Sequence, residues 1–189
     1  MKRVLLSSLV AAAMVGGMPL AMAAQDIEAP ADQNSASQLK EFEQARVPVS
    51  DAISAVERQS RGKAVDIAFE LDHGKRVYRV RTYRDGAVWE GTLDATTGAL
   101  IGQGTTTNET QLDPEDQAEI AGLKSARTSL TEAVANVQRQ LGGKAFDAGV
   151  EQKGGNVVYE IRLVKNGSVL GATVDPASGQ VSPDPTAPR

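Results

Sequence analysis

A tandem duplication places the strongest limit on how this chain folds. The segment Gly62-Lys63-Ala64 recurs as Gly143-Lys144-Ala145, 81 residues later, and the match continues without a gap from about residue 50 to residue 101. A unit of about 55 residues therefore occurs twice, and both copies should form the same supersecondary structure. Besides this triplet, fifteen residues of the first copy recur unchanged at this offset: Ala52, Val56, Arg58, Gln59, Asp66, Glu70, Gly74, Val77, Tyr78, Arg81, Gly86, Val88, Thr92, Asp94 and Gly98.

Each unit begins with the pattern of an amphipathic helix. Ser129 and Glu132 have the spacing of a capping box, in which each side chain satisfies a free backbone donor of the first turn. Pro48 suits the first turn of the helix in the first copy, and Gly62 and Gly143 are expected to end the two helices. Apolar residues recur at helical spacing in both copies: Val49, Ala52, Ile53 and Val56, then Leu130, Ala133, Val134, Val137 and Leu141.

After the helix the apolar period changes to two, which is typical of strands with one buried face. Tyr78 and Tyr159 should point inward from the second strand of each unit. Asp85-Gly86 and Asn166-Gly167 are strong hairpin signals, because both central residues of such a turn need a positive φ. We therefore predict an α+β fold of two tandem repeats, each with one helix packed on a three-stranded antiparallel sheet.

The order of these features resembles the PepSY family. A helix is followed by Gly-Lys-Ala, a strand, a Val-Tyr strand, an Asp-Gly or Asn-Gly hairpin and a closing Asp-x-x-x-Gly, and this order occurs twice over about 110 residues. The resemblance implies a small domain found in propeptides of thermolysin-like metallopeptidases, where it inhibits or chaperones the protease, and also found alone in exported bacterial proteins. We expect no catalytic domain beside the two repeats, in contrast to the propeptide arrangement, so the inhibitor role is an analogy.

The first residues have the order of a secretory signal peptide. Lys2 and Arg3 precede an apolar run, and small residues before Ala23 and Ala24 form a cleavage region. We expect a periplasmic or secreted protein without a membrane span in its mature part. The expected organisation is a signal peptide (1–24), a flexible segment (25–37), a first repeat (38–101), a linker with a short helix (102–125), a second repeat (126–182) and a disordered tail (183–189).

Composition argues against an enzyme or a nucleic-acid-binding protein. The chain has no cysteine and a single histidine, His73, which falls in an expected turn. It therefore lacks the residues for a thiolate site or a His-rich metal site, and offers no base for a Ser-His-Asp triad outside this turn. Without Lys2 and Arg3, 18 of the 20 basic residues remain against 24 acidic ones, and the basic residues are dispersed. We expect no catalytic residues, no cofactor and no metal site.

The sheet face away from the helix is the more informative surface. In the first copy it should present Arg79, Arg81, Tyr83 and Glu90, and aromatic residues and arginine are enriched at protein interfaces. These four residues are the candidate partner surface. Two alternatives remain: the repeats bury these faces against each other, or a helix over about 114–126 covers one of them.

Two classes of function follow. The first is an exported, non-enzymatic module that binds a protein partner, with a peptidase as the candidate partner to be inhibited or regulated. The alternative is a small-ligand or metal-responsive sensor or stress component of the cell envelope.

Overall fold

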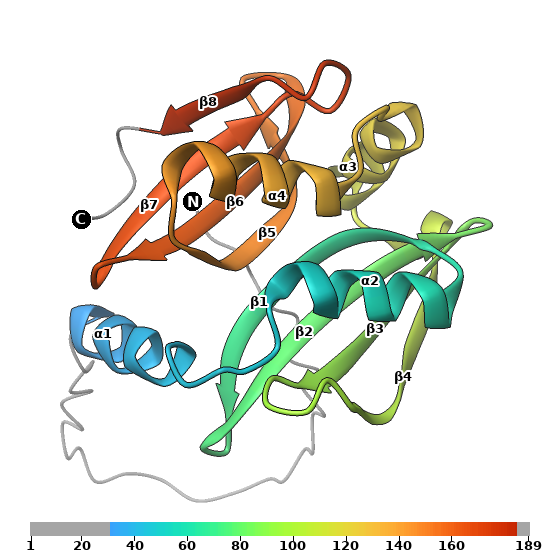
Figure 1. Ribbon diagram of the computed structural model, residues 1–189. Helices are drawn as coiled ribbons and strands as arrows, with labels where there is room; N and C mark the ends of the chain where they lie inside the picture. The colour runs from blue at the N-terminus through green and yellow to red at the C-terminus, as the bar shows by residue number, and fades with distance from the viewer. Residues whose placement is uncertain (1–30, 185–189) are drawn as a thin grey trace, which may run out of the picture.

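The strands of both repeats form one antiparallel sheet. The computed structural model describes residues 31–184, and its eight strands lie in the order β4-β3-β2-β1-β5-β6-β7-β8 (Figure 1). The two copies therefore lie side by side and do not stack their outer faces on each other. The strands are β1 (Lys63–Asp72), β2 (Lys75–Arg84), β3 (Ala87–Asp94), β4 (Leu100–Asn108), β5 (Lys144–Lys153), β6 (Asn156–Lys165), β7 (Ser168–Val174) and β8 (Val181–Asp184).

The two repeat helices lie next to each other on one face of this sheet. Helix α2 (Val49–Ser60) packs on β1 and β2, and α4 (Leu130–Leu141) packs on β5 and β6 (Figure 1). Their buried stripes are the apolar positions expected from the sequence. The capping box of Ser129 and Glu132 is confirmed.

Two further helices lie at opposite ends of the seam between the repeats. Strands β1 and β5 pair at only three positions, from Asp66↔Gly149 to Ala68↔Asp147. Helix α1 (Ala31–Phe42) contacts β1, and α3 (Pro114–Ser125) contacts β5 and β6. Phe42 and Leu123 are both buried in the shared core and are themselves 81 residues apart. The duplicated unit therefore includes a preceding helix that the sequence comparison did not reveal.

The same tyrosine hydrogen bond fixes each helix entry to the sheet. The Tyr78 hydroxyl donates to the Val47 carbonyl oxygen at 2.7 Å, and Tyr159 donates to the Thr128 carbonyl oxygen at 2.7 Å. Burial raises the pKa of both phenols, to about 12 for Tyr159. The inward direction expected for both tyrosines is confirmed, since both are fully buried.

The expected turns are confirmed, with a small shift at the helix ends. Asp85-Gly86 and Asn166-Gly167 have positive φ at both positions, and the exposed His73 lies in a turn of the same kind. The left-handed residue that ends α2 is Arg61 and not Gly62, and Gly142 and not Gly143 ends α4. A non-glycine residue such as Arg61 can adopt this conformation at a modest cost, so each helix ends one residue before the glycine that was predicted to end it.

Each repeat contributes four strands, so the three-stranded prediction is wrong in this respect. The expected linker at 102–125 begins instead inside β4, and α3 occupies its second half. A strand at the edge of a sheet pairs with a neighbour on one side only. Glycine, threonine and asparagine are therefore tolerated in it. Positive φ angles at Gly102 and Gly104 accommodate an irregularity opposite 90–92.

The expected flexible ends are partly ordered. Residues 31–37 of the segment 25–37 belong to α1, which is held by Phe42. Residues 183 and 184 of the expected tail belong to β8, where Pro183 occupies an edge strand that needs no outward N–H. The expected signal peptide (1–24) and residues 25–30 and 185–189 lie outside the described residues.

Candidate functional site

The four predicted partner residues do share one face, but they divide into two groups. Register places Arg81 opposite Glu90 and Arg79 opposite Thr92, so these side chains project from the same side of β2 and β3. Arg79 makes an ion pair with Glu70 at 2.5 Å and keeps 38% of its side chain exposed. Glu90 is exposed. Arg79 and Glu90 are therefore accessible to a partner.

Arg81 instead connects the first repeat to α3. Its guanidinium binds Asp66 in the neighbouring strand and Asp116 of α3, the latter at 2.9 Å, and lies 3.9 Å from Glu119. Burial would lower the pKa of Arg81, but the two aspartates outweigh this and raise it. Arg81 stays charged and positions the connecting helix, so it is not a free contact residue.

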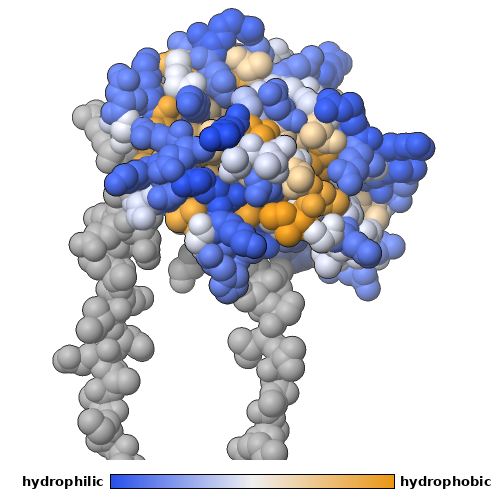
Figure 2. Space-filling model, turned by 60° about the horizontal axis from the view of Figure 1, so that its bottom comes forward, coloured by the Kyte–Doolittle hydropathy of each residue, from blue (hydrophilic) through white to orange (hydrophobic). Residues whose placement is uncertain are grey.

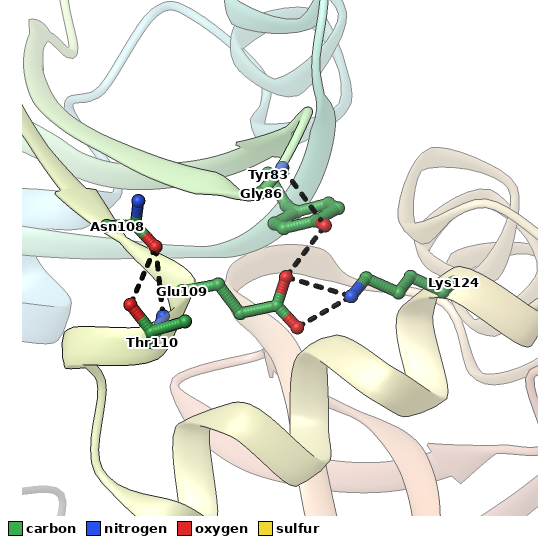
Figure 3. A network of polar contacts seen from close by, with 6 residues as sticks. All are labelled: Tyr83, Gly86, Asn108, Glu109, Thr110 and Lys124. Carbon is green, nitrogen blue, oxygen red and sulfur yellow. Dashed lines mark hydrogen bonds and ion pairs between the residues drawn. The ribbon is translucent and has the colours of Figure 1, made fainter.

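Tyr83 belongs to a second polar network that also holds α3 (Figure 3). Its hydroxyl donates to Glu109 at 2.8 Å and accepts from the Gly86 amide at 3.2 Å. The Lys124 ammonium binds Glu109 at 2.6 Å and lies 5.0 Å from the Tyr83 ring centre. Hydrogen bonds from Lys124 and Tyr83 lower the pKa of the Glu109 carboxyl. The 3-10 turn η1 (Glu109–Gln111) carries this carboxylate, and Asn108 caps the turn.

The accessible remainder of this face is called the open face and consists of Arg79, Glu90, Thr92 and Ile101. Thr92 pairs with Ile101 of β4, so both lie on the same side as Arg79. Ile101 is 45% exposed and is one of two large exposed apolar residues in the described chain, with Leu71. The surface in Figure 2 is mainly hydrophilic, with apolar side chains in smaller groups. A charged pair beside an exposed isoleucine is a mixed surface suited to protein contact.

A groove lies on the other side of the same strands. It holds about 360 Å³ between α2 and the β3–β4 edge, within the range of about 300–1,000 Å³ typical of ligand sites. The Thr82 hydroxyl at this groove is buried and has no hydrogen-bond partner. We call this the α2–β4 groove, and its walls include Val56, Ser60, Thr82, Trp89, Leu100 and Thr106.

Trp89 forms one wall of the groove and lies close against two glycines. A Cβ added at Gly91 or Gly104 would come within 2.0 or 2.7 Å of the indole ring. The indole N–H donates to the Gln103 carbonyl oxygen at 3.2 Å. Trp89 is only half-buried because the groove leaves part of its ring accessible.

The second repeat closes the equivalent space. Ser60 and Thr82 correspond, 81 residues on, to Leu141 and Leu163. Leu163 is fully buried, and Leu141 packs against the core. This groove was not predicted from the sequence. The copies nevertheless differ at this place, because two small polar residues of the first copy stand where the second copy has two leucines.

Glu119 is a buried acid on the inner side of α3. It is 6% exposed at the α3 end of the seam. Burial raises its pKa to about 8, and Glu151, Asp116 and Asp66 add to the shift, whereas Arg81 opposes it. Within residues 31–184 no group of three or more acids or histidines is arranged to hold a metal ion. In the same part of the chain no helix has the length and apolar character to cross a membrane.

Comparison with known proteins agrees with the duplicated architecture. A family model described as "Peptidase propeptide and YPEB domain", PepSY, matches residues 46–103 and 128–182. No significant match is found among curated proteins. A crystal structure of a "putative lipoprotein" from Clostridium difficile 630 shares 23% identity, with a TM-score of 0.39, over 74% of this chain and 94% of that chain. That likeness is too distant to bear on fold or function.

Proposed function

Because the chain belongs to the PepSY family, we propose that it is an exported, non-catalytic module that binds a protein partner through the open face of its first repeat. The partner proposed is a peptidase, which the module inhibits or regulates. PepSY modules are propeptide-like and non-catalytic, which supports a regulatory role.

The accessibility of the open face carries this proposal. Arg81 and Tyr83 hold α3, whereas Arg79 and Glu90 remain at the surface beside Ile101. In the second repeat the position of Arg79 is taken by Glu160, whose carboxylate binds Lys153 at 2.9 Å. The two copies therefore present different charges on the same face, and only the first combines an accessible arginine with an exposed isoleucine. A docking surface on the first repeat explains this difference.

Capture of a partner by crosslinking tests the proposal. The mature chain, tagged after its last residue, is crosslinked in envelope and culture fractions, and the captured proteins are identified. We expect one enriched protein that is lost with Arg79→Glu/Glu90→Lys and kept with Arg58→Glu. Arg58 is exposed on α2, on the other side of the sheet, so its variant controls for charge reversal alone. Equal capture by all three proteins would refute the open face as the docking surface.

Inhibition is then measured with the captured protein. If it is a peptidase, its cleavage of a peptide substrate should fall as the mature chain is added and should fall less with Arg79→Glu/Glu90→Lys. An unaffected cleavage rate would remove the inhibitory part of the proposal while leaving the docking part intact.

A small-ligand sensor is the second candidate, and the α2–β4 groove is the observation that favours it. Its metal-responsive form is tested by calorimetric titration with calcium and zinc, together with thermal unfolding. A ligand that binds the folded state raises the unfolding temperature, so unchanged unfolding and no heat would exclude the metal form.

A further inference from the structure

Within the described residues, the outer strand of the first repeat has a free edge whose protection is the irregularity around Gly102 and Gly104, and not charge or proline. In the described chain β4 pairs with β3 alone and ends the sheet. Free edges are commonly protected by charge, proline, shortness or bulges. Strand β4 has nine residues and contains neither a charged residue nor a proline. At the other edge, β8 has only four residues, which include Pro183 and Asp184.

The second half of β4 is the part that can accept another strand. The irregularity of β4 lies around Gly102 and Gly104. Residues 105–108 follow it and pair regularly with β3, from Glu90↔Thr105 to Ala87↔Asn108. All four residues are exposed. Their outward backbone groups are available to an extended segment, the mode of recognition known as strand addition.

The α2–β4 groove opens beside this same stretch. Thr106 belongs to the groove wall and pairs with Trp89, which forms the neighbouring wall. In a strand added to a sheet edge, alternate side chains point to one face. One side chain of an added segment would therefore enter the groove next to the indole ring, while its backbone pairs with β4.

The groove also limits the chemistry of its occupant. Apolar walls from Val56, Trp89 and Leu100 favour an aliphatic or aromatic side chain. None of the lining residues is acidic, and Arg84 lies at one end. The Arg84 guanidinium forms an ion pair with the exposed Asp85 at 3.0 Å and donates a hydrogen bond to the Ser60 carbonyl oxygen at 3.4 Å. The charge of the groove thus favours a neutral or acidic segment over a basic one.

We propose that the α2–β4 groove and the 105–108 edge together bind an extended, neutral or acidic polypeptide segment, which adds to the sheet beyond β4 and places one apolar side chain against Trp89. This proposal rests on the proposed function only in taking a protein segment as the ligand. The surface is different: the groove lies on the helix side of the sheet, and the open face lies on the opposite side.

Fluorescence of Trp89, the single tryptophan of the chain, reports directly on the groove. The probe is a capped peptide of alternating threonine and valine with one central leucine, titrated into the mature protein. We expect a saturable change in fluorescence. Replacing the leucine with alanine should weaken binding about tenfold or more, since burying a leucine side chain contributes more than about 1.4 kcal/mol. Methylating the backbone nitrogens that face β4 should also abolish binding.

The second repeat supplies the matched variant. Ser60→Leu/Thr82→Leu introduces the residues that fill the equivalent space in the other copy. This variant should unfold at or above the wild-type temperature and lose the peptide response. It retains Arg79 and Glu90, so it should still capture the partner of the open face. Loss of the peptide response with Arg79→Glu/Glu90→Lys is not expected, and the two proposals therefore fail separately.

Four results would overturn the groove proposal. The first two are an unchanged fluorescence when the peptide is added, and equal peptide affinity in the wild type and in Ser60→Leu/Thr82→Leu. The third is equal binding of the methylated and unmethylated peptides. The fourth is a groove that a small apolar molecule saturates while the peptide gives no response. A fifth is a dimer in sedimentation that Thr106→Lys dissociates, because a second copy of the chain would then occupy the edge.

Discussion

The buried carboxyl of Glu119 should make the stability of the fold decrease with pH. In the folded protein burial raises its pKa from 4.5 to about 8, with Glu151, Asp116 and Asp66 adding to the effect and Arg81 opposing it. Between these values the folded state holds a proton that the unfolded state has released. The unfolding free energy therefore falls as pH rises, by at most about 1.4 kcal/mol per pH unit.

The size of the effect follows from this interval. From about pH 5.5 to about pH 7.5 the loss attributable to Glu119 is about 2 kcal/mol. Glu119→Gln removes the titrating group while keeping a side chain of similar shape. Urea unfolding of both proteins at both pH values measures the difference, and the variant should lose about 2 kcal/mol less than the wild type over this range.

A matched control separates this effect from general charge removal. Glu115 lies on the same helix but is exposed, so Glu115→Gln should keep the pH dependence of the wild type. Equal pH dependence in the wild type and Glu119→Gln would refute the reasoning, because Glu119 would then be ionised in the folded protein.

Three further predictions concern stability. Tyr78→Phe and Tyr159→Phe each remove one 2.7 Å hydrogen bond, so each should cost about 1 kcal/mol in urea unfolding, and the double variant should show the sum; a single variant without effect would argue against the bond. Phe42→Ala removes the aromatic contacts of α1 with Phe69 and Phe146, whose ring centres lie 5.2 and 5.8 Å away. The unfolding free energy should fall by about 3 kcal/mol or more. A fall below about 1 kcal/mol would mean that α1 is not part of the core. Leu163→Thr places a hydroxyl in the closed core of the second repeat and should lower the unfolding free energy by about 2 kcal/mol or more. Thr82→Leu in the first repeat should leave the unfolding free energy unchanged or raise it. Equal losses of unfolding free energy in the two variants would contradict the difference between the copies.

Local patterns in the sequence were sufficient to predict the centre of each repeat. Hairpins at Asp85-Gly86 and Asn166-Gly167 depend on two adjacent residues, and the stripes of α2 and α4 depend on residues within three turns. The edge strands could not be predicted in the same way. Strand β4 is exposed from Ile101 to Asn108, so it has no buried alternation to reveal it, and its glycines and threonines are also typical of connectors.

The seam between the repeats also could not be predicted from local patterns. It depends on α1 and α3 packing against strands distant in the sequence, and Phe42 reaches both Phe69 and Phe146. The face on which the four candidate residues lie could be predicted, but not which of them are already bound by other parts of the chain. Register alone places Arg79, Arg81, Tyr83 and Glu90 on one face, whereas the contacts of Asp116 and Glu109 with two of them require the position of α3.

The difference between the copies follows from what each one must do for the fold. A unit of about 60 residues buries too little surface to be stable by a wide margin, and here the two units share one core across the β1–β5 seam. The second repeat closes its edge with Leu141, Leu163 and a short β8. With that core supplied, the first repeat keeps an unpartnered Thr82 hydroxyl beside a groove, at a cost in stability. A feature that costs stability in one copy and is filled in the other is best explained by binding, so the first repeat is where a partner should be sought.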